Sequence, residues 1–235
     1  MPPKLRSTSA RDGLSEAMED VLKALLKSEV SGKTAATSSL ASLLGVTPSA
    51  VSQVVGKLRD MSLVEMVARG KPCLTEAGRD IAKEMLRHHR LLELFLTKAL
   101  GYSWDEAHPE AERLEHHISE NLEAAIDAHL GHPTHDPHGS PIPTADLELV
   151  PEDLVSLSAL AVGDRGTVRR VAGFDPALLR HLKSIGVVPG ALFRVEGLDP
   201  YGAGFILGVE GKGEPVCLAV EAARQVGVDP LEGNA

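Results

Sequence analysis

The stretch His108-Pro-Glu-Ala-Glu-Arg-Leu-Glu-His-His-Ile-Ser-Glu120 is densely charged and rich in glutamate and histidine. If it is helical, residues three and four apart share a face, so Glu112, Glu115 and His116 point the same way. His108 lies one turn earlier, and Pro109 falls in the first turn, where its missing N–H is tolerated. Two carboxylates and an imidazole on one face form a candidate divalent-metal site. The plain alternative is a solvated polar face without a ligand.

A second candidate helix precedes this stretch. Residues 79–100 carry leucine and isoleucine at helical spacing, and His89 and Glu93, four residues apart, share one face. Two neighbouring helices that each present histidine and glutamate are able to converge on one metal ion. We therefore predict that the middle of the chain is helical and binds metal.

The composition of the 235-residue chain is that of a globular protein with two or three small domains. The net charge of −9 is divided unevenly, with +3 on residues 1–75 and −12 on residues 76–235. A basic amino-terminal part is compatible with DNA binding, and an acidic remainder is compatible with cation binding.

Other sequence features bear on the compartment. The sequence has no run of 18 apolar residues and no apolar leader segment. Cys73 and Cys217 are too few and too far apart for a disulfide framework or a thiolate zinc site. We expect a cytoplasmic protein without a membrane partner.

Residues 37–58 predict a helix-turn-helix. Two short amphipathic segments flank Gly45, and Thr47 followed by Pro48 is the N-cap and first-residue pattern of a helix start. In this motif the second helix enters the major groove of DNA with its amino-terminal end first. The residues expected to meet base edges and phosphates are Thr47, Ser49, Ala50, Ser52, Gln53 and Lys57.

A short hairpin is predicted next. Residues 63–67 and 72–75 read as two strands, with Arg69 and Lys71 at the tip between them. A helix-turn-helix followed by a basic hairpin is typical of a winged helix, whose wing contacts the phosphate backbone. An ordinary solvated turn explains the hairpin alone equally well, but three helices followed by a wing favour DNA binding.

The remainder of the chain differs in composition and in predicted secondary structure. Residues 129–145 are rich in proline and histidine, and a polar turn before a linker is a better interpretation than metal binding by His132, His135 or His138. From Leu160 short β runs alternate with glycine and proline, and residues 177–185 form a helical insertion. We expect a small five-stranded barrel over residues 155–230, without a catalytic pair.

Taken together, these segments resemble the diphtheria toxin repressor family of metal-dependent regulators. The resemblance rests on TPSAVSQVVGKL, LTEAGRDIA, RHHRLLELFL, HPEAERLEHHIS and DPHGSPIP, in the family's order. The barrel resembles the family's SH3-like, FeoA-type domain through LAVGDRGTV and LLRHLKSIGVVPG. The fold implied is mainly α with a β carboxy-terminal part. Its domains are a winged helix-turn-helix over residues 1–75, a helical dimerisation and metal-binding domain over 76–145, a linker over 146–154 and the barrel domain over 155–235.

The resemblance also implies two metal sites. The primary site would use Asp20, Glu112, Glu115 and His116. The second site would use His89, Glu93 and His108. Without the resemblance, Asp20 reads as a surface acid near a helix start.

Departures from the family's pattern bear on the metal. Iron-responsive members have methionine at Asp20 and cysteine at Glu112, and the change from sulfur to oxygen suits Mn²⁺, with Fe²⁺ as the alternative. Those members also lend two barrel side chains to the second site. Arg170 and Gly173 stand at these positions here, and Asp175 is a weak substitute.

The function predicted is that of a homodimeric, manganese-activated transcriptional regulator, a repressor of metal-homeostasis genes that binds a palindromic double-stranded DNA operator. We predict no enzymatic activity. A metallohydrolase would need histidine at the first position of His-Xaa-Xaa-Glu-His, where this chain has Glu112. The third alternative is a metal-storage protein that does not bind DNA.

Overall fold

The computed structural model describes residues 11, 13–32, 35–67, 70–150, 152–172 and 175–231. The chain divides into two compact units. The first unit is Met1–Leu91, Glu112–His132 and Pro143–Leu149, and the second is Leu92–Ala111, Pro133–Ile142 and Val150–Ala235. Within the described residues no single helix is long and apolar enough to cross a membrane, and one bent pair, Thr37–Leu44 with Pro48–Asp60, passes by length and composition alone.

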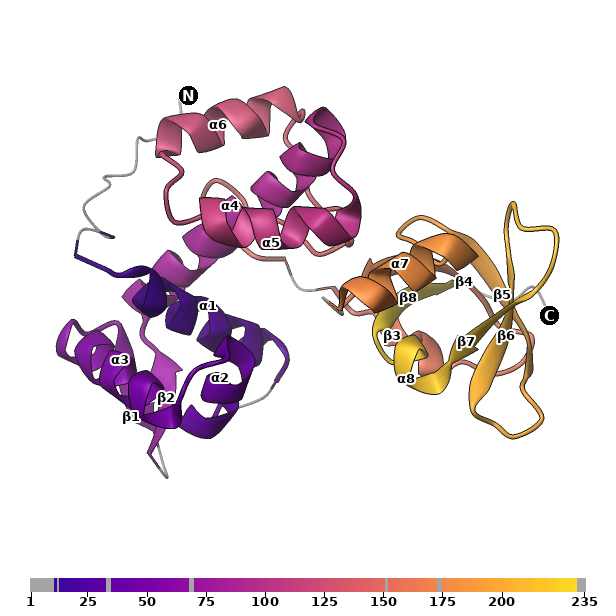
Figure 1. The fold of residues 1–235 in the computed structure, drawn as a ribbon, viewed down its shortest axis with the longest axis horizontal. Coiled ribbons are helices and arrows are strands. Elements are labelled where there is room, and N and C mark those ends of the chain that lie inside the picture. The colour runs from indigo at the N-terminus through magenta and orange to yellow at the C-terminus, as the bar shows by residue number, and fades with distance from the viewer. Residues whose placement is uncertain are drawn as a thin grey trace. The chain divides into compact units, whose positions relative to one another are not determined.

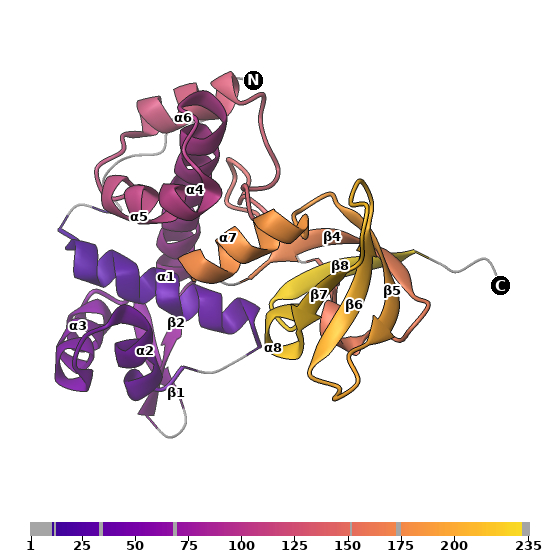
Figure 2. The same ribbon diagram turned by 45° about the vertical axis from the view of Figure 1, so that its right-hand side comes forward.

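The amino-terminal part of the first unit is a winged helix-turn-helix, as predicted. Figures 1 and 2 show its three helices gathered beside a two-stranded hairpin. Leu22, Leu40 and Leu58, one from each helix, are fully buried in a shared apolar core. The elements are α1 (Glu16–Val30), α2 (Thr37–Leu44), α3 (Pro48–Asp60), β1 (Val64–Val67) and β2 (Lys71–Leu74).

Local chemistry explains where α2 ends and α3 begins. Gly45 adopts the left-handed conformation that ends α2 (φ 66°), which glycine reaches at little cost. The Thr47 hydroxyl accepts a hydrogen bond from the Ala50 N–H at 3.2 Å, and Pro48 is the first helical residue of α3. The predicted N-cap is therefore confirmed.

The hairpin differs in one respect from the expectation. Lys71 is not at the tip: it is the first residue of β2 and pairs with Val67. The antiparallel ladder extends one residue closer to the turn than the sequence indicated, as far as the Val67–Lys71 pair. Arg69 lies outside the described residues.

One acidic residue of α1, Glu29, links this helix to the hairpin and to α4 (Glu76–Ala99). Glu29 accepts hydrogen bonds from Arg79 Nε at 3.1 Å, from the Leu74 N–H at 3.3 Å and from the Cys73 thiol at 3.4 Å. These donors lie on β2 and on the first turn of α4. Gly78 of α4 lies so close to the Leu63 carbonyl oxygen that a Cβ atom would collide with it. The hairpin, α1 and α4 are thus closely joined.

The stretch after α4 is not the single helix predicted. It forms α5 (Trp104–Leu114) and α6 (Glu120–His129), separated by a turn that contains Glu115 and His116. Ser103 starts α5 because its N–H and hydroxyl both donate to Glu106, at 3.1 and 2.5 Å. Pro109 therefore lies inside the helix and not in its first turn, which corrects the prediction.

The second unit contains a six-stranded antiparallel sheet with strand order β3-β8-β4-β5-β6-β7, one strand more than the five expected. The two-residue β3 is too short to give a periodic signal in the sequence. Leu179 and Leu182 of the helical insertion are buried in the same core as the sheet. Its elements are β3 (Val155–Ser156), β4 (Arg165–Val171), α7 (Pro176–Ile185), β5 (Leu192–Leu198), β6 (Gly204–Val209), β7 (Val216–Ala219), α8 (Val220–Ala223) and β8 (Val226–Leu231).

Candidate metal centre

Three predicted ligands from separate parts of the first unit lie together. Asp20 comes from α1, and Glu115 and His116 come from the turn after α5. One ligand atom of each lies within 4.8 Å of the others. His116 Nε2 is 3.5 Å from Asp20 Oδ1 and 3.7 Å from Glu115 Oε1. Two carboxylates and one imidazole at this separation are a donor set that fits a divalent cation of the Mn²⁺ or Fe²⁺ kind.

Glu112, the fourth predicted ligand, belongs to a second group that overlaps the first. This group consists of His89, Glu112 and Glu115, again with ligand atoms within 4.8 Å. His89 Nδ1 lies 2.6 Å from Glu115 Oε2 and 3.7 Å from Glu112 Oε1. Glu115 is fully buried and is shared by both groups.

A lysine of α1 lies between these carboxylates. Lys23 of α1 is buried, and its Nζ donates to Glu112 Oε1 at 3.0 Å and to Glu115 Oε1. Burial opposes the charged form, but the charges of Glu115 and Glu112 outweigh it and raise the pKa of Lys23. Lys23 is therefore an ammonium ion in contact with two predicted ligands.

The ring of His116 is oriented by α1. Its Nδ1 lies 2.6 Å from Glu19 Oε2, which leaves Nε2 facing Asp20 and Glu115. Burial lowers the pKa of His116, but hydrogen bonds to Asp20 and Glu19 reverse this and raise it to about 10. Arg11 holds Glu19 in turn, with its Nε donating to Glu19 Oε1 at 2.9 Å. A carboxylate behind a ligating histidine is common at metal sites, where it fixes the tautomer and the ring orientation.

The residues predicted for the second site are distributed as follows. In the second unit, Glu93 and His108 are in contact, with 2.8 Å between Glu93 Oε1 and His108 Nδ1. His138 of the histidine-rich stretch is fully buried, with its Nε2 3.6 Å from the same Glu93 oxygen. His89 precedes Glu93 by one turn on α4, and the contacts given above place its Nδ1 against Glu115.

Other candidate ligands make different contacts. His135 Nε2 lies 2.8 Å from Glu152, and His132 lies 2.8 Å from Asp127 on α6. Asp175 caps α7 by accepting a hydrogen bond from the Ala177 N–H at 2.9 Å, so its carboxylate already has a structural role. Arg170 lies 4.0 Å from Glu152. Gly173 is outside the described residues.

A further acidic and histidine group went unnoticed in the sequence. Glu84, His88 and Glu120 of the first unit have ligand atoms within 4.8 Å of one another. Cations also lie in this group, since Arg11 is 3.6 Å from Glu84. His88 is fully buried, and Glu123 lies 2.8 Å from its Nε2. The contacts are those of a buried ion-pair network.

The predicted DNA-reading residues form one face of α3. Val51, Val55 and Leu58 are buried on the opposite face. Lys71 on β2 is half-buried. The exposed residues are Thr47, Ser49, Ala50, Ser52, Gln53 and Lys57. This polar face is available to a ligand, as a recognition helix requires.

Comparison with known proteins agrees with this arrangement. Residues 13–70 match the model of the iron-dependent repressor amino-terminal DNA-binding domain, and residues 75–144 match its metal-binding and dimerisation domain. Residues 155–230 match the FeoA domain. The iron-dependent repressor IdeR of Mycobacterium tuberculosis is 34% identical over 231 residues, which cover 93% of this chain and 99% of that protein.

The chain belongs to the diphtheria toxin repressor family. Members of this family are metal-dependent, DNA-binding transcriptional repressors. The diphtheria toxin repressor of Corynebacterium diphtheriae is itself 31% identical over 133 residues, 57% of this chain and 59% of that protein.

Solved structures of relatives include one with manganese and one with zinc. A manganese-dependent transcriptional repressor in complex with manganese superposes with a TM-score of 0.84 at 39% identity, covering 91% of this chain and all of that one. The repressor ScaR with bound Zn²⁺ gives a TM-score of 0.75 at 32% identity, over 90% and 98% of the two chains. The family members similar to this chain therefore include both iron-dependent and manganese-dependent repressors.

Proposed function

We propose that this family member is a cytoplasmic, homodimeric repressor that binds a palindromic DNA operator when Mn²⁺ is available. The observation that carries the proposal is the position of Asp20. This ligand belongs to α1, whose core residues pack with α3, the helix that presents the polar face. The other ligands, Glu112, Glu115 and His116, lie in α5 and in the turn after it, a different part of the chain.

The residues act by joining these two parts. Asp20, Glu112, Glu115 and His116 would hold the ion, which supplies the positive charge that allows their carboxylates to approach. Asp20 then fixes the position of α1, and α1 fixes α3 through Leu22 and Leu58. In a dimer this would set the spacing of two recognition helices, and a palindromic site requires a defined spacing. Coupling of about 1–3 kcal/mol per site is typical of such linkage.

The donor atoms support Mn²⁺ as the ion. The primary group offers carboxylate oxygens and imidazole nitrogen, and neither cysteine belongs to a ligand group among the described residues. The relative solved with manganese, at 39% identity, also favours this ion. Fe²⁺ is the second candidate, because the 34% identical relative is named an iron-dependent repressor. The second site stays a proposal as predicted, at His89, Glu93 and His108; Glu93 and His108 are in contact, and His138 lies beside Glu93.

The domain organisation is part of the proposal. Domains at residues 1–75, 76–145 and 155–235, with a linker at 146–154, are supported by the family-model matches at 13–70, 75–144 and 155–230. Dimerisation is supported by the description of the middle model as a dimerisation domain.

The test is a metal-by-metal DNA-binding titration. A DNA ligand is first selected from a random-sequence pool with the Mn²⁺-loaded protein, and its affinity is then measured with Mn²⁺, Fe²⁺, Zn²⁺ and chelator. We expect Mn²⁺ to activate binding at the lowest free concentration, and we expect Glu112→Cys to shift the preference toward Fe²⁺ or Zn²⁺. Equal affinity with chelator and with every metal would refute metal activation. Activation by Fe²⁺ at lower concentration than Mn²⁺ would refute the choice of ion.

A further inference from the structure

Lys23 is an unusual residue for its position. Its side chain is only 5% exposed, and a lysine is almost never fully buried unless it is paired. Its partners are Glu112 and Glu115, and Asp20 Oδ1 lies at 4.0 Å. All three partners are proposed metal ligands. The most buried cation of α1 is therefore directed at the metal centre itself.

The bonds of Lys23 engage the atoms that a metal ion would need. The same oxygen of Glu115, Oε1, receives the Lys23 ammonium and lies 3.7 Å from His116 Nε2. Glu112 offers Oε1 to Lys23 and lies beside His89 through the same atom. An ammonium and a divalent cation repel each other, and they cannot both have full use of one carboxylate oxygen. Binding of a metal ion at Glu115 thus requires Lys23 to move away from Oε1 or to share this oxygen with the ion.

We propose that Lys23 is a tethered cation that competes with the divalent metal for Glu112 and Glu115, and so raises the metal concentration at which the protein responds. This inference rests on the proposed function, since it concerns regulation of the same centre. Without metal, Lys23 neutralises the buried carboxylate of Glu115 and the partly exposed carboxylate of Glu112, which would otherwise repel each other. The protein therefore folds with its ligands in place but already partly satisfied.

The chain supplies matched variants for a test. Lys23→Met keeps most of the length of the side chain and removes the charge, and Lys23→Arg keeps the charge. Lys83 on α4 is the control, because its nearest acidic partner is Asp80 at 3.8 Å, outside both ligand groups. The measurement is calorimetric titration of each full-length, metal-free protein with Mn²⁺ alone.

We expect Lys23→Met to bind Mn²⁺ about tenfold more tightly than the unsubstituted protein. This is within the range of about 5–150-fold that is typical of coupling between two binding events. Lys23→Arg and Lys83→Met should stay within about threefold of it, a difference under 1 kcal/mol. If Lys23 is only a structural partner, Lys23→Met will bind Mn²⁺ no more tightly than the unsubstituted protein, and the proposal is wrong.

Loss of Lys23 also leaves the buried carboxylate of Glu115 without this counter-charge, so Lys23→Met is expected to melt at a lower temperature in chelator. Thermal melts with and without Mn²⁺ cover the case in which this variant is partly unfolded. The competition model requires a larger Mn²⁺-induced rise in Tm for Lys23→Met than for the unsubstituted protein. An equal or smaller rise would overturn it. If only Lys23→Met binds Mn²⁺, the competition stands and the proposed manganese response fails; if neither binds, both fail.

Discussion

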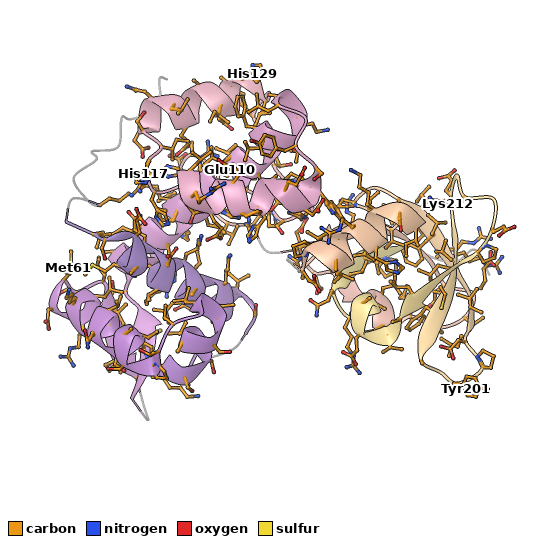
Figure 3. All side chains as sticks on the ribbon, viewed as in Figure 1. Met61, Glu110, His117, His129, Tyr201 and Lys212 are labelled. Carbon is orange, nitrogen blue, oxygen red and sulfur yellow. The ribbon has the colours of Figure 1, made fainter. Side chains whose placement is uncertain are left out.

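At the scale of single residues, His116 and its neighbour His117 make a natural comparison. His116 is turned inward between Glu19, Asp20 and Glu115, whereas the His117 side chain is 70% exposed. Figure 3 labels His117 in the turn that follows α5. Adjacent residues of the same type are thus in opposite surroundings, and only one of them is able to ligate.

We expect His116→Ala to abolish Mn²⁺-dependent DNA binding, because it removes the only nitrogen ligand of the primary group among the described residues. His117→Ala should leave that binding unchanged. Fluorescence anisotropy with labelled DNA across a Mn²⁺ titration checks both. An unaltered Mn²⁺ response in His116→Ala would show that the primary site has been wrongly assigned.

Glu19 is expected to act through His116 and not as a ligand. Replacing it by alanine removes the acceptor that orients His116 Nδ1, so Mn²⁺ affinity should fall about 10–100-fold. Glu16, whose side chain is 64% exposed near His117, provides the matched control Glu16→Ala.

A second readout separates orientation from general damage. The ¹⁵N chemical shifts of His116 report which ring nitrogen carries hydrogen, and they should change in Glu19→Ala even without metal. Unchanged shifts together with unchanged affinity would contradict this role for Glu19.

At the scale of secondary-structure elements, the contact between Gly78 and Leu63 gives a prediction for stability. Gly78→Ala places a methyl group against the Leu63 carbonyl oxygen, which is backbone and cannot turn aside. Overpacking of this kind costs about 1–3 kcal/mol in the free energy of unfolding. Gly56→Ala in α3 is the control, since nothing lies within 4 Å of its Cβ position, and it should be neutral or stabilising. Urea unfolding curves measure both, and equal stabilities would exclude the close contact.

The elements also show what periodicity was able to predict. The pattern of residues 37–75 predicted the helix-turn-helix and its hairpin, because a proline, a threonine cap and a glycine marked the boundaries. The prediction of one continuous helix through residues 108–120 was wrong, because the spacing of residues does not reveal where a helix ends. Ser103–Glu106 and Ser119 are the capping signals that were overlooked; the Ser119 hydroxyl accepts from the Leu122 N–H at 3.3 Å and begins α6.

The ligand set illustrates the same limit. Glu112, Glu115 and His116 were predicted as ligands from their spacing, and the end of α5 with the turn after it keeps them close together. Glu19 was not found, because its role depends on α1 meeting a residue 97 positions away in sequence. The contact of Lys23 with Glu112 depends on the same long-range pairing. Long-range pairing of this kind leaves no periodic signal in a single sequence.

For the whole molecule, the buried His88 predicts how stability depends on pH. Burial lowers its pKa, but hydrogen bonds to Glu120 and Glu123 raise it to about 9, while Arg11 opposes them. Glu84 faces the same cluster. Because the folded pKa exceeds the ordinary value of 6.5, the stabilisation is complete below pH 6.5 and is lost as pH rises through about 9.

The expected difference is on the order of 2 kcal/mol. It should appear as a fall in the free energy of unfolding between pH 6.5 and pH 9 that is larger for the unsubstituted protein than for His88→Gln. Urea unfolding in chelator measures it, with His117→Gln as the exposed control. Parallel pH profiles for the unsubstituted protein and His88→Gln would contradict the assignment.

The bonds made by Glu29 have a mechanical consequence for the repressor. The Glu29 carboxylate bonds α1 to β2 and to the start of α4. A displacement of α1 at Asp20 would therefore be transmitted to the hairpin directly, without passing through α3. The helix that is expected to enter the major groove and the hairpin that is expected to contact the phosphate backbone would then move together as one rigid body. The concentration of the metal ion would then set the orientation of the whole winged helix-turn-helix. Operators that differ only in the geometry of their flanking phosphates would also be distinguished.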